Sequence, residues 1–325
     1  MATFARSTFS AKAYAAFRPT YPPSVYRTVL GFHQLPTPNG GTLLDLGCGH
    51  GLIARELSPH FSAVVAVDPS AGMVAQARQM TTATADAGGS NHINNSSSSS
   101  NNSNITFRQG GAEDLDFLAD GAVDMAVAGQ AAHWFDYGRA WPALARTVRP
   151  GGTLAFWGYK DNVLLGAGRA ATAVMERFVY GFGEVAPGVT GMGPCWEQPG
   201  RNILRDLLRS VRPPERDWVE VTRLEHEPGE EEEGEEGKEV CCWLRKTMKL
   251  GEVENYTRTF SCFTRWREEH PEVKSRAEGG DGDIIDVMWD HMVDAVPEWR
   301  AMGEQWREVE VVNDWGTYIL MARRR

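Results

Sequence analysis

Three glycines within five residues are the first feature of the sequence that points to a ligand. The stretch Leu43-Leu44-Asp45-Leu46-Gly47-Cys48-Gly49-His50-Gly51 follows an apolar run and opens a segment with helical character. Glycine allows a sharp turn and close approach of a ligand, because it has no Cβ atom. Such a turn also occurs in nicotinamide enzymes, so the glycines alone leave the ligand open.

A carboxylate follows the next apolar run, about twenty residues beyond the glycine turn. The segment is Val64-Val65-Ala66-Val67-Asp68-Pro69-Ser70. An acidic residue at the carboxyl end of a second strand can accept hydrogen bonds from both ribose hydroxyls of a bound nucleotide. A simple helix cap is the alternative role for Asp68, but the spacing favours ribose binding.

The Asp-Leu-Gly-Cys-Gly form of the turn resembles motif I of S-adenosylmethionine-dependent methyltransferases. This resemblance implies that Gly47, Cys48 and Gly49 face the methionine part of the coenzyme and that Asp45 points toward its amino group. It also implies a coenzyme site at Asp68 and Pro69. Met73, one helical turn later, would lie against the adenine ring, with ordinary core packing as its alternative role.

The segment Gln109-Gly110-Gly111-Ala112-Glu113-Asp114-Leu115 resembles the part of the same family that recognises adenine. The family often has an acidic residue where this chain has Gly111. That departure moves the expected acceptor of the adenine amino group to Glu113, with the backbone N–H of Ala112 on the ring.

Three further segments resemble a narrower group, the trans-aconitate methyltransferase-like proteins of fungi and bacteria. They are Tyr14–Pro22, Gln130–Asp136 and Tyr256–Ser261. The resemblance implies an N-terminal lid that brings Tyr14 and Arg18 near the carboxylate of the coenzyme, and a coenzyme contact from Gln130. Phe260 stands where this group commonly has Trp, so the shape of its substrate pocket does not carry over.

His133 is the titratable residue that follows the fourth apolar run. An imidazole near its unperturbed pKa can take a proton at neutral pH, so His133 is the candidate catalytic base. Orienting the substrate and a purely structural role are its alternatives. Methyl transfer from a sulfonium is an in-line displacement, in which a carboxylate acceptor needs no base and a hydroxyl benefits from one. The expected reaction is O-methylation of a carboxylate or hydroxyl on a small molecule.

Aromatic residues and one arginine are candidates for the substrate pocket. Trp134 follows His133, and Trp157 and Tyr159 leave the fifth apolar run at the edge where open α/β sheets bind ligands. Trp266 and Arg258 lie on a helical stretch that could form the roof of the pocket. A solvated surface position is the alternative for Arg258.

Five apolar runs alternate with helical or loop segments and predict the sheet that would position these residues. They are Thr42–Leu46, Ala63–Val67, Ile105–Gln109, Val123–Ala128 and Thr153–Trp157. Helices are predicted at 52–57 and 71–80. The alternation is typical of parallel βαβ units. The expected fold class is α/β, a Rossmann-like class I methyltransferase with a mostly parallel seven-stranded sheet.

The rest of the chain predicts a helical cap and a C-terminal antiparallel hairpin. Helices are expected at 166–180 and near 202–210, with a loop at 181–199 between them. The hairpin would join 308–312 to 317–322 through a turn at Asn313, Asp314 and Gly316. The expected domains are a lid at 1–40, a coenzyme-binding core at 41–160, the cap at 161–300 and the hairpin at 301–325.

Two segments have biased compositions. Residues 81–104 are rich in Ser and Asn and are expected to be disordered, at the sheet edge away from the ligand. Residues 225–238 are expected to form a solvated acidic loop, with partner binding as the alternative.

Composition narrows the classes of function. The net charge of −10 argues against a nucleic-acid partner. No apolar stretch is long enough to span a membrane, and a cytoplasmic protein is expected. Acids are lacking in residues 1–44, which leaves a mitochondrial transit peptide as the alternative. The five cysteines have no C-x-x-C spacing, which predicts reduced thiols and no bound metal. A monomer or a weak homodimer is expected.

Two other classes of protein use similar motifs. A nicotinamide dehydrogenase would favour G-x-G-x-x-G, whereas this chain has glycines at 47, 49 and 51. A pseudoenzyme that binds the coenzyme, or a non-methylating enzyme on the same fold, remains open at the level of sequence.

Overall fold

The computed structural model describes residues 18–34, 40–87, 104–229 and 242–325, and the chain divides into two compact units. We call residues 21–159, 206–225 and 317–325 the sheet unit. Residues 160–205 and 226–316, with the N-terminal residues up to Thr20, are the helical unit. Strands β5 and β10 contribute residues to both units.

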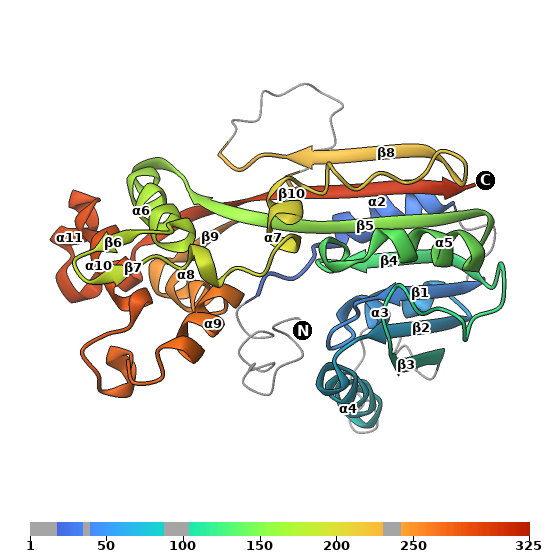
Figure 1. Cartoon of the computed structure of the whole chain (residues 1–325), viewed down its shortest axis with the longest axis horizontal. Helices are drawn as coiled ribbons and strands as arrows, with labels where there is room; N and C mark the ends of the chain where they lie inside the picture. Colours follow the sequence, from blue (N-terminus) through green and yellow to red (C-terminus); the bar gives the residue numbers. More distant parts are fainter. Residues whose placement is uncertain (1–17, 35–39, 88–103, 230–241) are drawn as a thin grey trace, which may run out of the picture. The chain divides into compact units, whose positions relative to one another are not determined.

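The sheet has the strand order β3-β2-β1-β4-β5-β10-β8, with β9 also paired to β10 (Figure 1). Its strands are β1 (Thr42–Leu46), β2 (Ala63–Asp68), β3 (Ile105–Gln109), β4 (Val123–Gly129), β5 (Val148–Leu164), β8 (Trp218–His226), β9 (Arg245–Lys249) and β10 (Glu310–Arg324). The pairs β1–β2, β1–β4, β2–β3 and β4–β5 are parallel. Figure 1 shows β10 running opposite to β5. The predicted α/β fold with a mostly parallel sheet is confirmed, and β9 makes the sheet eight-stranded.

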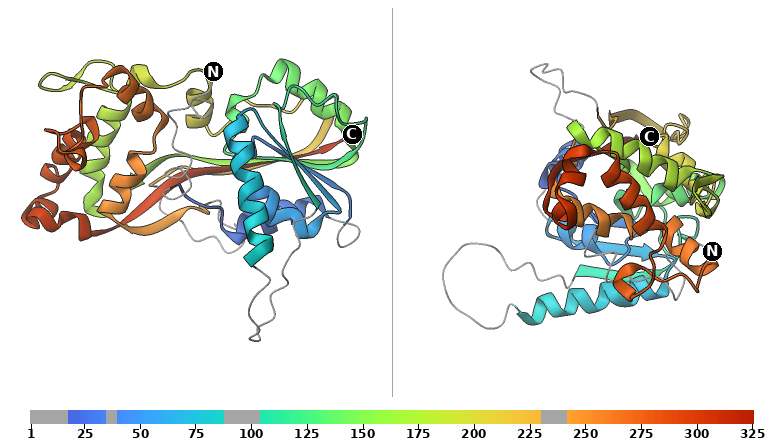
Figure 2. Two further views of the ribbon diagram at one scale, coloured as in Figure 1. Left: turned by 90° about the horizontal axis from the view of Figure 1, so that it is seen from below. Right: turned by 90° about the vertical axis from the view of Figure 1, so that its left-hand side faces the viewer.

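Helices cover both faces of this sheet, which explains why its central strands are apolar on both sides. The helices of the sheet unit are α2 (Pro23–His33), α3 (Leu52–Leu57), α4 (Ala71–Ala87) and α5 (Tyr137–Thr147). Figure 2 shows α5 on one side and α2 and α3 on the other. Asp136 starts α5 by accepting a hydrogen bond from the backbone N–H of Gly138. The core is densest at β1 and β4, where Leu43, Leu44 and Met125 are completely buried.

The helical unit contains most of the remaining elements. They are α6 (Arg169–Tyr180), α7 (Gly200–Arg205), α8 (Leu250–Thr257), α9 (Ser261–Glu269), α10 (Ile284–Asp294), α11 (Pro297–Ala301) and the antiparallel pair β6 (Glu184–Ala186) and β7 (Val189–Thr190). Its short 3-10 helices are η5 (Gly166–Gly168), η6 (Gly193–Cys195), η7 (Arg276–Glu278) and η8 (Gly303–Glu308). The sheet unit has two more, η2 (Ser58–His60) and η4 (Ala132–Trp134). The helix predicted near 202–210 is shorter than expected, because Leu207 and Leu208 adopt positive φ angles.

The C-terminal hairpin predicted between residues 308 and 322 is wrong, because β10 is one continuous strand. The polar residues that indicated a turn are buried in the strand and have partners there. Asn162 donates a hydrogen bond to the Asn313 side chain at 2.9 Å, and the Gly229 N–H donates to the Asp314 carboxylate at 2.8 Å. Local turn signals were therefore overridden by tertiary hydrogen bonds.

Both segments of biased composition are shorter than predicted. Helix α4 continues to Ala87, and the Asn104 side chain donates to the carbonyls of Ser58 and Phe61 at 3.0 and 2.8 Å. Residues 88–103 lie outside the described part of the chain. At the other segment, Glu225 and His226 belong to β8, and residues 230–241 are not among those described.

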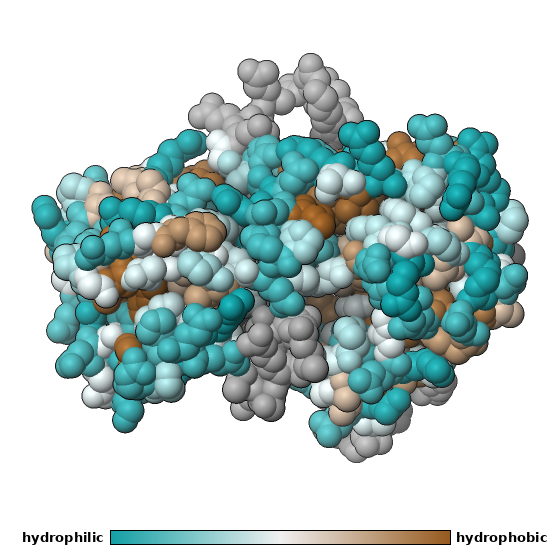
Figure 3. Space-filling view, viewed as in Figure 1, coloured by the Kyte–Doolittle hydropathy of each residue, from teal (hydrophilic) through white to brown (hydrophobic). Residues whose placement is uncertain are grey.

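Polar residues dominate the one face of the molecule that Figure 3 shows, and apolar residues are scattered among them. In the described segments, none of the helices combines the length and apolar character needed to cross a membrane.

Candidate active site

The glycine turn after β1 lies against the ends of the neighbouring strands. Gly47 and Gly49 have φ angles of +66° and +54°, which residues with a side chain rarely adopt. A Cβ atom on Gly47 would lie 2.4 Å from the Cβ of Ala131, which follows β4. The Cys48 N–H donates to the carbonyl of Val67 in β2. Backbone, rather than side chains, therefore forms this part of the site.

Asp68 ends β2 and holds the turn in place. Its carboxylate accepts hydrogen bonds from the backbone N–H groups of Gly49 at 2.9 Å and Ser70 at 2.8 Å, one on each oxygen. A carboxylate has about four acceptor positions, so two remain for further donors such as ribose hydroxyls. Burial raises the pKa of Asp68 above its usual value, although the two amide donors oppose that rise.

Asp45 is completely buried in β1 next to Asp68. Neither of its carboxylate oxygens has a hydrogen-bond partner among the residues that the structure describes. Burial raises the pKa of Asp45 to about 7; the backbone N–H of Ala54 opposes this rise, and the negative charge of Asp68 adds to it. An unpaired buried carboxylate is costly, so this position favours a cationic ligand group.

The predicted adenine-side residues come from helix α4 and from the segments that follow β2 and β3. Met73 and Ala112 are buried, and the Met73 N–H donates to the Ser70 hydroxyl. Glu113 uses one carboxylate oxygen to accept the N–H of Asp136 at 2.7 Å. The carbonyl of the exposed Pro69 accepts a hydrogen bond from Gln109. Their adenine contacts remain predictions.

Cys48 is a buried thiol rather than a nucleophile. Burial raises its pKa well above the ordinary value, and Asp45 and Asp68 add to the rise. The thiol therefore stays protonated at neutral pH and serves as packing beside the turn.

Gln130 fixes the ends of β4 and β5 relative to each other. Its side-chain amide donates to the carbonyl of Tyr159 and accepts the N–H of the same residue, both at 2.8 Å. A Cβ atom on Gly158, the residue before Tyr159, would come within 2.5 Å of both the Gln130 side chain and the Tyr318 hydroxyl. Gln130 therefore shapes this wall of the site, and its predicted contact with the coenzyme stays a prediction.

Aromatic side chains gather at the same carboxyl ends. His133 is buried on η4, with its ring centre 4.7 Å from that of Trp134. Trp157, at the end of the β4–β5 pairing, is completely buried and packs edge-on against Tyr21 and Tyr26 at 5.8 and 6.3 Å. His133 follows β4, the strand next to β1, and Trp157 lies in β5, one strand further along the sheet.

Sequence reasoning missed two residues of this region, Tyr26 and Tyr318. Both lie in the sheet unit, on α2 and β10. Within the described residues, the Tyr318 hydroxyl and the Trp157 indole N–H are buried without hydrogen-bond partners. They are donors available to a ligand. No local spacing pattern could have indicated Tyr318, because β10 enters the sheet from the far end of the chain.

The remaining predicted residues belong to the helical unit or lie outside the description. Arg18 donates to the carbonyl of Thr259 at 3.0 Å and its guanidinium lies over the rings of Tyr256 and Phe260. Trp266 stacks on His270 with ring centres 4.3 Å apart. Tyr14 is outside the described residues.

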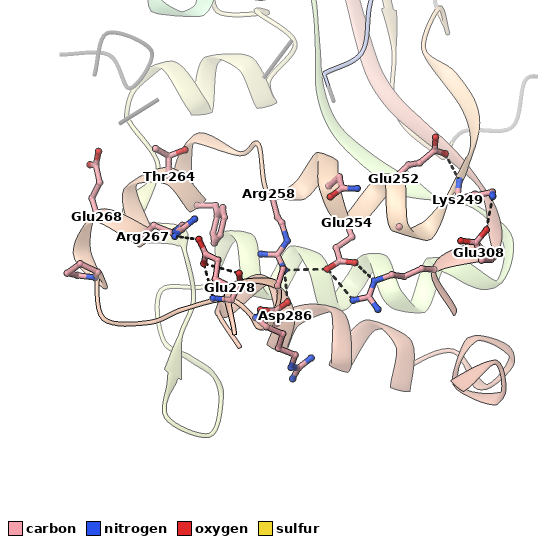
Figure 4. Close-up of a pocket in the computed structure, with 18 residues that line it drawn as sticks. Lys249, Glu252, Glu254, Arg258, Thr264, Arg267, Glu268, Glu278, Asp286 and Glu308 are labelled. Carbon is pink, nitrogen blue, oxygen red and sulfur yellow. Dashed lines mark hydrogen bonds and ion pairs between the residues drawn. The ribbon is translucent and has the colours of Figure 1, made fainter. Parts of the chain in front are cut away.

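Arg258 is held by three carboxylates at a large hollow of the helical unit. It reaches Asp286 at 2.6 Å, Asp283 at 2.8 Å and Glu254 at 3.3 Å, and Figure 4 shows it directed at Glu254 and Asp286. The hollow has a volume of about 1200 Å³. Its other charged residues also pair with each other, as in Lys249–Glu308 and Arg267–Glu278. Structural ion pairing accounts for Arg258 without a substrate.

The residues of the sheet unit fit S-adenosylmethionine. The unpaired Asp45 suits an ammonium or sulfonium charge, and the open acceptor positions of Asp68 suit two ribose hydroxyls. A Cβ atom on Gly49 would meet no other atom within 4 Å, so the turn leaves open space at that position.

Comparisons with known proteins cover the same part of the chain. The family model for a methyltransferase domain matches residues 44–156. The probable S-adenosylmethionine-dependent methyltransferase CRG1 of Saccharomyces cerevisiae is 23% identical over 99% of this chain and 98% of that protein. A Dictyostelium discoideum protein named as a methyltransferase is 28% identical over 85% of this chain and 88% of its own length.

A solved structure from Anaeromyxobacter dehalogenans, assigned to the type II methyltransferases, shares the fold. It is 24% identical, covers 94% of this chain and 98% of its own, and superposes with a TM-score of 0.58. The matched domain begins in β1 and ends in β5, and so includes the glycine turn, Asp68 and Gln130.

Proposed function

We propose that this chain, a class I S-adenosylmethionine-dependent methyltransferase, transfers the methyl group to an oxygen atom of a small molecule, either a carboxylate or a hydroxyl. The observation that carries the proposal is the buried His133 beside the half-buried Trp134 on η4, directly after β4 and one strand from the glycine turn. A titratable group beside aromatic rings suits a compact organic acceptor better than a macromolecule. The net charge of −10 also disfavours nucleic acid.

The coenzyme supplies an activated methyl group when it is bound. The chain has to hold the acceptor oxygen in line with that group and exclude water. Asp45 offers a counter-charge, Asp68 offers two acceptor positions, and Gln130 holds the β4 and β5 ends together. Orientation of this kind contributes roughly 7–11 kcal/mol in favourable cases, which is enough for a carboxylate acceptor to react without a base.

Incubation with labelled S-adenosylmethionine and a metabolite extract tests the proposal directly. We expect a labelled small molecule and S-adenosylhomocysteine, both lost in Asp68→Ala. Coenzyme binding with no labelled product from any extract would favour the alternative, a pseudoenzyme or a non-methylating enzyme. Label on protein or nucleic acid would overturn the small-molecule assignment.

His133 is the residue that distinguishes the two acceptor types. With a hydroxyl acceptor, His133→Ala should lower kcat by roughly a hundredfold or more, and the remaining rate should rise at high pH. With a carboxylate acceptor, the same change should raise KM more than it lowers kcat, because only positioning is lost. Coenzyme affinity should survive in both cases. Wild-type values of both constants in the folded variant would leave His133 a structural role only.

Within the methyltransferases, we place the chain in the trans-aconitate methyltransferase-like group. Support comes from the motifs around Tyr21, Gln130–Asp136 and Tyr256–Ser261. Small tricarboxylates and dicarboxylates are the first acceptors to assay. We also propose a cytoplasmic monomer or weak homodimer without membrane or nucleic-acid partners, which sedimentation at several concentrations and imaging of the tagged protein would test.

A further inference from the structure

Three potential metal ligands from distant parts of the chain converge in the helical unit. His226 ends β8, Cys242 precedes β9, and Asp314 lies in β10, to which both strands pair. One ligand atom of each lies within 4.8 Å of the others. His226 and Asp314 are buried, and Cys242 is half-buried.

The Asp314 carboxylate is oriented by partners on one oxygen. Its Oδ2 accepts hydrogen bonds from the Gly229 N–H at 2.8 Å and the Arg245 guanidinium at 3.0 Å. Its Oδ1 lies 3.5 Å from the Cys242 Sγ, and the His226 Nε2 is 3.1 Å from both oxygens. Outer hydrogen bonds of this kind orient carboxylate ligands in metal sites.

The separations agree with a tetrahedral zinc ion. With zinc bonds of about 2.0 Å to nitrogen and oxygen and 2.3 Å to sulfur, tetrahedral angles separate N from O by about 3.3 Å and S from O by about 3.5 Å. The measured separations are 3.1 Å and 3.5 Å. Two of the three donor separations therefore match a tetrahedral site, and all three ligand atoms lie within 4.8 Å of one another.

We propose that His226, Cys242 and Asp314 bind one zinc ion, with water as the fourth ligand on the half-exposed side of Cys242. Thiolate, imidazole and carboxylate together suit this borderline-soft ion. On binding, the Cys242 thiol loses its proton to solvent and forms the S–Zn bond. His226 binds through Nε2 and keeps its proton on Nδ1. The bound ion, thiolate and carboxylate sum to zero charge, and Arg245 stays on the far oxygen.

The ion ties together positions that the chain separates widely. Cys242 and Asp314 are 72 residues apart, and His226 and Asp314 are 88 apart. A zinc bond at this point fastens the ends of β8 and β9 to β10. The proposed role is stabilisation, because the ligand set belongs to the helical unit and includes none of the residues assigned to methyl transfer.

Titration of chelator-treated full-length protein with zinc alone tests the proposal. We expect one equivalent of tight binding, with affinity falling at least a hundredfold in Cys242→Ser, since even outer-shell changes cost ten- to hundredfold. Cys195→Ser is the matched control, because Cys195 is another free thiol of the helical unit, on η6 beside Glu269. It should bind zinc as the wild type does.

A second readout covers a variant that fails to fold. Cobalt added to the wild-type protein should give a thiolate-to-cobalt absorption band, and zinc should raise the unfolding temperature of the wild type. Loss of the band and of the temperature shift in folded Cys242→Ser supports the site. Absence of the band in the wild type, or unchanged zinc affinity in Cys242→Ser, would show that the three residues form only a hydrogen-bonded cluster.

Discussion

Asp45 in the sheet unit and Arg258 in the helical unit are both buried or largely buried charged residues, but their surroundings are opposite. Arg258 has three carboxylate partners within 3.3 Å. Burial alone would lower its pKa, but Asp283, Asp286 and Glu254 outweigh burial and raise it. Asp45 has no hydrogen-bond partner among the described residues, and burial raises its pKa.

The difference separates two uses of buried charge. A charged group paired with the protein's own counter-charges stabilises the fold, and removing it leaves those counter-charges buried without a partner. A charged group that the protein leaves unpaired can instead pair with a ligand of opposite charge. Arg258, although predicted as a substrate residue, fits the first case, and Asp45 fits the second.

The largest effect is expected for Arg258→Ala. The buried Asp283 and Asp286 would lose the cation between them, and Glu254 would keep only Arg307, a loss that typically costs about 3–5 kcal/mol of folding stability. Thermal or denaturant unfolding should show this loss, while the affinity for S-adenosylmethionine of protein that stays folded should be unchanged. Arg267→Ala is the matched control, because the exposed Arg267–Glu278 pair is worth about 1 kcal/mol or less. A stable Arg258→Ala variant with a raised KM for the acceptor would return Arg258 to the substrate site.

A large loss of coenzyme affinity is expected for Asp68→Ala. Two charge-assisted hydrogen bonds to ribose are lost, each worth about 1.5–3 kcal/mol, so the coenzyme Kd should rise at least about a hundredfold. Calorimetry measures this. Asp124→Asn is the control, since Asp124 accepts the N–H of Thr42 at the opposite edge of the sheet. An unchanged Kd in folded Asp68→Ala would remove Asp68 from the coenzyme site.

The sheet unit could be predicted well because its signals are local. Strands β1 and β3 and helix α3 have the predicted bounds, since each is a short apolar or amphipathic run between turn residues. The predicted coenzyme residues Asp45 and Asp68 lie near the carboxyl ends of two such runs, strands β1 and β2. Their proximity follows from two adjacent parallel strands.

Features formed by distant segments could not be predicted. Strand β10 continues through Asn313 and Asp314 because their side chains accept hydrogen bonds from Asn162 and from the N–H of Gly229. The group of His226, Cys242 and Asp314 has no common spacing in the sequence, so a search for C-x-x-C could not detect it. Helix α5 and strand β8 were not predicted, although Val219 and Val221 alternate with Glu220 as strand residues do.

Asp45→Asn should stabilise the coenzyme-free protein at pH 8. Because the folded pKa of Asp45 is raised from 3.8 to about 7, the folded protein keeps a proton that the unfolded chain releases between those values. Stability therefore falls as pH rises through this window, by up to about 1.4 kcal/mol per pH unit, and the loss persists above it. The variant should unfold at a higher temperature at pH 8 and match the wild type near pH 4.

The smallest expected effect is the pH dependence of coenzyme affinity, which connects Asp45 to its ligand. A cationic group beside the carboxylate favours the ionised form, so binding S-adenosylmethionine below about pH 7 should release a proton. The wild-type affinity should then increase by at most about tenfold per pH unit from pH 5.5 to 7 and level off above, where Asp45 is already ionised. Calorimetry in two buffers of different ionisation enthalpy counts the released proton. Asp45→Asn should bind more weakly at pH 8, with a flatter dependence below pH 7. A wild-type affinity independent of pH over this range would mean that the coenzyme's charge lies elsewhere, and that the burial of Asp45 is offset by the protein itself.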